Sequence, residues 1–228
     1  MDKNILKSFA IEARNELIEK IKVKARQYGI EKDSIKNSNI ISSDSIVING
    51  TPLSKDEKLQ REKLIKKIKD INENGGDGYS SIIEEVAYTW FNRFTALRFM
   101  EVNNYIPTRV RALSSTIPGS VEPELIKEAS NVDLRVDKQK IYEMKLNNDM
   151  ESLFKYMIIA QCNSLNIVLP FMFEKIGHYT ELLLPDGLLN EGAFIRKLTD
   201  INIIPESDWE DVEIIGWLYQ YYNSEEKD

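Results

Sequence analysis

Two arginines separated by one residue, Arg109 and Arg111, have the type and the setting that best fit a binding chemistry in this chain. They stand in the segment YIPTRVRALSS, which also carries one threonine and two serine hydroxyls. Guanidinium and hydroxyl groups are common partners of the phosphate oxygens of DNA, and such contacts fix the register of a protein on the duplex. The alternative is structural, with the arginines paired to carboxylates such as Glu101 or Glu122 to hold the loop on the core. Both interpretations stand at this point.

A second set of cations lies at helical spacing in the segment 55–73. A helix over these residues places its lysines along one face, where they are candidates for contact with the DNA backbone. Lysines opposite a narrow apolar stripe are also the ordinary solvated side of a surface helix. The four candidates are Lys55, Lys58, Lys66 and Lys69.

Groups suited to catalysis or metal binding are scarce. His178 is the single histidine and Cys162 the single cysteine, and neither has a partner at metal-ligand spacing. Cys162 lies in an apolar run, so we expect a small buried side chain. Glu143 and Lys145 have the spacing of a nuclease triplet, but they fall in a segment expected to be helical. We therefore predict no catalytic residue and no metal site.

Charge is unevenly distributed along the 228 residues, whose net value is −7. Residues 1–74 contain 16 Lys and Arg against 12 Asp and Glu, a balance of +4, whereas residues 75–228 contain 14 against 25, a balance of −11. An acidic chain is a poor stand-alone binder of nucleic acid, although a basic front permits a local phosphate contact. No apolar run approaches the ~20 residues that cross a bilayer, no signal peptide begins the chain, and a lone cysteine fits a reducing compartment. We expect a cytoplasmic protein without membrane contact.

Hydrophobic periodicity predicts a mainly α, multi-helix fold with one short β-hairpin near residues 40–50. The hairpin is expected where Ile46 to Ile48 run into the turn Asn49-Gly50. Capping patterns place helix starts at Ser54, Ser81, Asp149 and Asp208, and Gly29 ends the first helix. The expected helices cover residues 3–28, 55–73, 82–103, 123–131, 137–147, 149–164, 179–184, 191–200 and 209–222.

The helix expected at 82–103 is the predicted core of the domain. Its apolar face consists of Ile83, Val86, Ala87, Trp90, Phe94 and Leu97. The helix at 209–222 is apolar on two sides, so one stripe is available to dock outside this domain. Trp217 and Tyr221 are the docking candidates on that second stripe.

Three stretches carry a resemblance to a known family: Lys3–Ala25, Ser81–Gly119 and Glu210–Asp228. They resemble the N-terminal region of the PglX family, the adenine-specific DNA methyltransferases of bacterial phage-exclusion (BREX) defence systems. The resemblance implies one helical N-terminal domain over residues 1–228, with a basic front at 1–74 and an acidic core at 75–228. It implies that the S-adenosylmethionine-dependent catalytic core follows downstream. It also implies three partners: that core, double-stranded DNA and other phage-defence proteins.

The residues that perform methyl transfer on adenine are missing from this sequence. Such an enzyme needs an Asp/Asn-Pro-Pro-aromatic tetrapeptide that holds the flipped base, and no Pro-Pro pair occurs here. The G-x-G run Gly76–Gly78 follows a charged helix rather than a strand, so it predicts a helix-joining loop. We therefore expect a catalytically inert platform that binds no cofactor itself, supports the core, and contacts the DNA backbone. The alternatives are a module that recruits other defence components and a nuclease-like domain.

Overall fold

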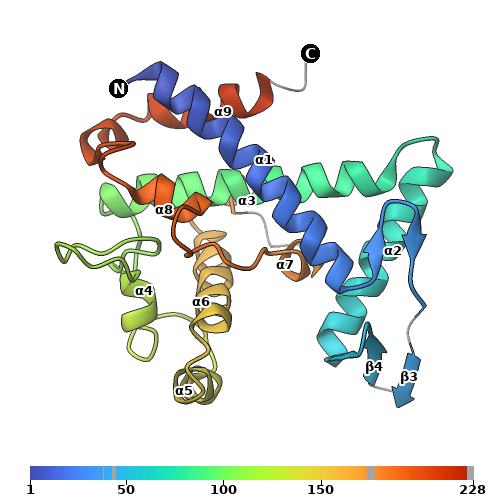
Figure 1. Cartoon of the computed structure of the whole chain (residues 1–228). Helices are drawn as coiled ribbons and strands as arrows, with labels where there is room; N and C mark the ends of the chain where they lie inside the picture. Colours follow the sequence, from blue (N-terminus) through green and yellow to red (C-terminus); the bar gives the residue numbers. More distant parts are fainter. Residues whose placement is uncertain (38, 43–44, 174–177, 225–228) are drawn as a thin grey trace. The chain divides into compact units, whose positions relative to one another are not determined.

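The computed structural model describes residues 1–37, 39–42, 45–173 and 178–224, and these are mainly α-helical (Figure 1), as predicted. No helix within these ranges is both long and apolar enough to span a membrane. One 3-10 helix, η1, covers Glu206–Glu210. The α-helices are α1 (Lys3–Gln27), α2 (Lys55–Glu73), α3 (Gly78–Val102), α4 (Glu124–Lys127), α5 (Lys138–Leu146), α6 (Met150–Leu165), α7 (His178–Leu182), α8 (Phe194–Thr199) and α9 (Glu213–Tyr222).

The chain divides into two compact units. Unit 1 comprises Met1–Arg14, Phe91–Lys175 and Gly187–Asp228, and unit 2 comprises Asn15–Trp90 and Ile176–Asp186. The helices α1 and α3, 25 residues each, contribute residues to both units. The charge balance changes sign near residue 74, but the units are not divided there. A single domain over 1–228 stays a prediction.

Unit 2 contains the β structure. The predicted hairpin is confirmed, because β4 (Ser45–Ile48) pairs antiparallel with β5 (Thr51–Leu53). Asn49 and Gly50 connect them with φ of 51° and 81°, the left-handed pair that a two-residue hairpin turn requires. Three more strands extend the β structure beyond the prediction: β3 (Asn39–Ser42) joins β4, and β1 (Ile30–Glu31) pairs with β2 (Ser34–Ile35).

Gly29 ends α1, as predicted, and fits tightly into unit 2. Its φ is 68°, and a Cβ atom there would lie 2.9 Å from Cγ2 of Ile48 and 3.0 Å from Cβ of Lys36. The buried Arg61 of α2 binds the backbone on either side of this contact. Its Nε donates to the carbonyl of Tyr28 at 2.7 Å, and its Nη2 donates to the carbonyl of Lys36 at 2.6 Å. The close approach therefore leaves room for glycine alone.

Two capping predictions for the helices of unit 2 had opposite outcomes. The box at the start of α2 is confirmed, with Ser54 and Glu57 each accepting the other's backbone N–H. The box at Ser81 is wrong, because α3 already begins at Gly78. Asp77 caps it instead, accepting the N–H of Ser80 at 3.0 Å and its hydroxyl at 2.8 Å. The pKa of Asp77 is lowered to about 2. The largest cause is the hydrogen bond from the Ser80 backbone, followed by the bonds from the Ser80 hydroxyl and from Lys32. The S-x-x-E pattern falls one turn after the real cap.

An aromatic cluster forms the core of unit 1. The ring of Phe194 on α8 lies 5.9 Å from Phe9 of α1, 6.0 Å from Phe91 and 5.7 Å from Phe94 of α3, measured between centroids. Tyr222 of α9 lies 4.5 Å from Phe91. Four helices distant in sequence therefore meet at one cluster. The helices α4 and α5 both pack against α6 (Figure 1).

The predicted core face of α3 is confirmed, and so is the burial of Cys162. Cys162 of α6 is 1% exposed, and burial raises the pKa of its thiol to about 12, so it is protonated and unreactive at neutral pH. The six predicted residues of α3 are each 2% exposed or less, namely Ile83, Val86, Ala87, Trp90, Phe94 and Leu97.

The two remaining capping predictions concern Asp149 and Asp208. Asp149 caps α6 as predicted, accepting the N–H of Ser152 at 3.0 Å. Asp208 does not cap the last helix, which begins at Glu213 after Asp211. Asp208 lies inside η1, and its carboxylate pairs with the Met1 amino group at 3.0 Å. A short 3-10 helix cannot be told from the first turn of an α-helix by periodicity alone, which explains the error.

Candidate functional site

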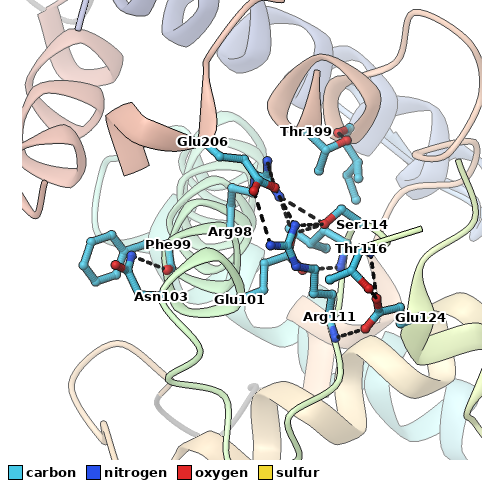
Figure 2. Close-up of polar contacts among 12 residues, drawn as sticks. Arg98, Phe99, Glu101, Asn103, Arg111, Ser114, Thr116, Glu124, Thr199 and Glu206 are labelled. Carbon is cyan, nitrogen blue, oxygen red and sulfur yellow. Dashed lines mark hydrogen bonds and ion pairs between the residues drawn. The ribbon is translucent and has the colours of Figure 1, made fainter. Parts of the chain in front are cut away.

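The centre of the candidate site is an ion pair within α3. Arg98 and Glu101 stand three residues apart, and their side chains are both 0% exposed. Arg98 Nη1 donates to Glu101 Oε1 at 2.9 Å (Figure 2). A buried guanidinium is stable only when paired and hydrogen bonded, since burial removes its hydration.

Glu206 of η1 joins this ion pair to the arginine loop. Its Oε1 accepts from Arg98 Nη2 at 3.2 Å and from Arg111 Nη1 at 2.5 Å, and its Oε2 accepts from Arg111 Nη2 at 3.3 Å. The hydrogen bond from Arg111 lowers the pKa of Glu206, although burial opposes it. Burial disfavours the charged form of Arg111, but its hydrogen bond to Glu206 and the negative charges of Glu206, Glu101 and Glu124 together outweigh this and raise its pKa. We call Arg98, Glu101, Arg111 and Glu206 the arginine–glutamate cluster.

The backbone of the loop is held on the same cluster. Glu101 Oε2 accepts the N–H of Leu113 at 2.8 Å, and its Oε1 accepts the hydroxyl of Ser114 at 2.8 Å. The Ser114 hydroxyl in turn accepts from Arg98 Nη1 at 3.0 Å. One buried carboxylate therefore positions two consecutive loop residues.

Glu124, at the start of α4, holds the loop from its other side. Its Oε2 accepts the N–H of Arg111 at 3.1 Å, and its Oε1 accepts the N–H and the hydroxyl of Thr116 at 2.7 and 2.6 Å (Figure 2). Burial alone would raise the pKa of Glu124, but the Thr116 bonds lower it. The stretch that the sequence marked as irregular is therefore ordered by side-chain carboxylates.

These contacts give the two loop arginines different roles. Arg111 forms the ion pair that the structural interpretation expected, but with Glu206 rather than with Glu101 or Glu122. The arginine–glutamate cluster holds two arginines and two glutamates, so it carries no surplus positive charge for a phosphate. A DNA contact by Arg111 stays a prediction, and its setting favours a structural role.

Arg109 is exposed and has no carboxylate in ion-pair contact within the described ranges. Its φ of 59° is unusual for a residue with a side chain, and strained positions of this kind concentrate at functional sites. Its Nη1 donates to the carbonyl of Asn104 at 2.8 Å, which limits where the guanidinium points. Arg109 therefore presents an accessible, oriented positive charge.

A cavity of about 510 Å³ lies beside the cluster, between loop residues 113–121 and the segment 196–202. Arg98 and Glu206 line it, together with hydroxyls such as that of Ser115. Its other carboxylate, Asp200, accepts the backbone N–H of Asn202 at 2.9 Å. Both carboxylates therefore already accept hydrogen bonds from within the protein. Across the described parts of the chain, no three His, Cys, Asp or Glu residues gather as a metal site would require.

The predicted lysine face of α2 carries mixed charge. Lys55, Lys66 and Lys69 are exposed and Lys58 is half-buried. Glu62 shares their face, because it precedes Lys66 by four residues, one helical turn. This negative charge weakens the attraction of the face for phosphate, and DNA contact by these lysines stays a prediction.

The predicted docking pair on α9 is half-buried. The rings of Trp217 and Tyr221 stack at 5.9 Å with an angle of 23°, and Lys3 Nζ lies 3.7 Å from the Trp217 ring centroid. Ile214 and Leu218 lie beside them on the same stripe of α9, and both are buried. Trp217 and Tyr221 are therefore partly accessible, and docking through them stays a prediction.

Acid is expected to loosen the arginine–glutamate cluster. Glu206 has a pKa below its ordinary 4.5, so its contribution to stability is complete above 4.5 and is lost as the pH falls through the lowered value. Thermal unfolding of the wild type and of Glu206→Gln, compared at pH 7 and below pH 4.5, measures this. The wild type should lose more of its Tm on acidification than the variant. Equal losses would mean that Glu206 is not the group that titrates.

Comparison with known proteins gives two close matches over the whole chain. The sequence is 38% identical over 247 aligned residues to "Adenine-specific methyltransferase PglX" of Lacticaseibacillus casei (strain Zhang), covering 100% of this chain and 20% of that protein. It is 37% identical over 237 residues to "Adenine-specific methyltransferase BrxX" of Escherichia coli O9:H4 (strain HS), covering 100% of this chain and 19% of that protein. The chain thus spans about a fifth of the length of these relatives. No family model matches it.

Proposed function

Over its whole length the chain belongs to the PglX family of adenine-specific methyltransferases, and from this we propose that it is the helical N-terminal domain of such an enzyme. In this proposal the domain supports a catalytic core, supplied by the rest of the polypeptide, that binds S-adenosylmethionine and methylates the exocyclic amine of adenine. The mark would label host DNA in a phage-defence system. The chain itself performs no methyl transfer, since it lacks the Pro-Pro motif that holds the adenine.

The observation that carries the DNA-contact part of this proposal is the contrast between Arg109 and Arg111. The ion pair between Arg111 and Glu206 holds the loop on the domain, while Arg109 of the same loop is exposed. A rigidly presented arginine on an acidic domain suits a single phosphate contact that helps to set the register on DNA, with most of the affinity supplied elsewhere. The lysines of α2 are a second, weaker candidate contact because Glu62 lies among them.

Support of the core is the second part of the proposal. The face of α9 that carries Trp217 and Tyr221 would dock on the following part of the polypeptide, as the resemblance led us to expect. Its aromatic rings are suited to an interface because they bury large area with little loss of side-chain freedom.

Arg109→Ala is expected to weaken binding of the 228-residue chain to a fluorescent DNA duplex. The slope of log affinity against log salt should become shallower by about one, because one phosphate contact releases about one counterion. Titrations at several salt concentrations measure the slope. Lys138→Ala, on the exposed surface of α5, removes the same charge and is the matched control.

The outcome separates the alternatives. A slope that Lys138→Ala changes as much as Arg109→Ala would reduce the effect to net charge and remove Arg109 from the proposal. A further loss on changing Lys66 and Lys69 to Gln would add α2 to the contact surface. Absence of binding at low salt would transfer the role to recruitment of other defence proteins, and metal-dependent cleavage of the duplex would support the nuclease-like alternative.

A further inference from the structure

One segment of unit 1 exposes an unusual amount of apolar surface. Between α6 and the next buried residue, Phe173, the chain contains no charged residue, and after Asn166 it reads Ile167-Val168-Leu169-Pro170-Phe171-Met172. Phe171 is 99% exposed, and the other apolar side chains are exposed by 36% to 84%. Single exposed apolar residues are ordinary, but a contiguous patch of them marks an interaction site.

The segment is a built loop with fixed ends. Leu165 and Phe173 on either side are both 0% exposed. Asn166 Nδ2 donates to the carbonyl of Phe173 at 2.8 Å and closes the loop, and the N–H of Leu169 donates to the carbonyl of Leu165 at 2.8 Å. The apolar side chains between these anchors therefore project from a defined turn, which we call the apolar knob (residues 167–172).

We propose that the apolar knob inserts into an apolar groove on the part of the polypeptide outside this chain. The inference rests on the proposed function and adds to it a second docking surface besides α9. About four-fifths of the length of the relatives lies outside the matched region, and under the proposed function the corresponding part of this polypeptide is the permanent partner. Permanent interfaces are more apolar than transient ones, which agrees with the uncharged, apolar composition of residues 167–172.

The chemistry of the knob disfavours other occupants. DNA would require cations, and the knob has none. A second copy would meet the convex knob with the same convex surface if the pair were related by two-fold symmetry, which buries little area. An apolar groove supplied by a covalently linked domain fits both the shape and the chemistry.

Hydroxyl-radical footprinting tests this on the intact polypeptide and on the 228-residue chain. Side-chain oxidation follows exposure, so Phe171 and Met172 should be oxidised roughly tenfold more slowly in the intact polypeptide. Tyr105, which is 60% exposed in unit 1, is the internal reference. Equal oxidation of the knob in the two proteins would overturn the proposal.

The variant Phe171→Ser makes the test independent of footprinting. It should leave the Tm of the 228-residue chain unchanged, because the side chain is 99% exposed there, and should lower the Tm of the intact polypeptide. Tyr105→Ser is the matched control and should leave the Tm of both proteins unchanged. A lower Tm of the 228-residue chain would show that the knob packs within the chain. Self-association of that chain that Phe171→Ser abolishes would show that the occupant is a second copy. Either result overturns the proposal.

The two proposals fail in distinguishable ways. Protection of Trp217 and Tyr221 without protection of Phe171 would keep the supporting role of the domain and overturn the knob. If neither surface is protected, and Arg109→Ala leaves the slope of log affinity against log salt unchanged, both the knob and the proposed function are overturned.

Discussion

Arg98→Met is expected to destabilise the protein by about 3–5 kcal/mol, the range seen when one partner of a buried ion pair is removed. Methionine has nearly the length of the arginine stem, so little volume is lost. The loss comes from Glu101, whose carboxylate is 0% exposed and would be left without a cation directly against it. Glu206 would retain Arg111 but lose its second guanidinium. Urea unfolding followed by tryptophan fluorescence measures the change as a shift of the midpoint.

The control for this variant is Arg109→Met, which makes the same chemical change at the exposed arginine of the loop. It should alter stability by no more than about 0.5 kcal/mol, as surface substitutions usually do. Adding Glu101→Met to Arg98→Met should recover part of the loss, because the pair is then replaced by apolar groups. A loss below about 1 kcal/mol for Arg98→Met would contradict the burial of the ion pair.

Gly29→Ala is expected to destabilise unit 2 by about 2–4 kcal/mol. Part of this, about 1 kcal/mol, is the strain of a side chain at the φ of 68°. The rest comes from overpacking, since the new methyl group would lie 2.9 Å from Cγ2 of Ile48 and 3.0 Å from Cβ of Lys36. The midpoint of urea unfolding reports the sum.

Gly50→Ala separates these two causes. Gly50 has a φ of 81°, but a Cβ there meets nothing within 4 Å, so only the backbone strain of about 1 kcal/mol should appear. The difference between the two variants therefore measures the close approach of α1 to the β structure. Equal effects at both glycines would show that Ile48 and Lys36 move aside to admit the methyl group at residue 29.

The long helices were predictable because their apolar residues repeat at helical spacing over several turns. The predicted and observed bounds of α2 agree to the residue, since a capping box marks its start and a loop rich in glycine its end. The β1–β2 hairpin was missed because strands of two residues have no periodicity to detect. The false box at Ser81 shows that a local motif cannot say whether the helix has already begun, since the stronger cap was Asp77.

The candidate site was predictable in its residue types and only partly in its connections. The sequence singled out the arginine loop and weighed an ion pair for Arg111, but it could not identify Glu206 as the partner, 95 residues away. Arg98 was missed altogether, because a cation inside an apolar helix shows its role only through the acids that reach it. The nearest signal was Glu101, three residues later, which is the spacing of an ion pair within a helix.

The reach of Glu206 also has a consequence for how the protein is made. During translation α3 and the arginine loop leave the ribosome well before η1, and at 5–20 residues per second the delay over 95 residues is about 5–20 seconds. Throughout that interval two arginines share Glu101 as the one acid of the cluster already synthesised. The nascent loop therefore has its contacts with Glu101 and Glu124 well before it gains its contact with Glu206. Premature termination before residue 206 would release a chain in which Arg98 and Arg111 lack the carboxylate that joins them.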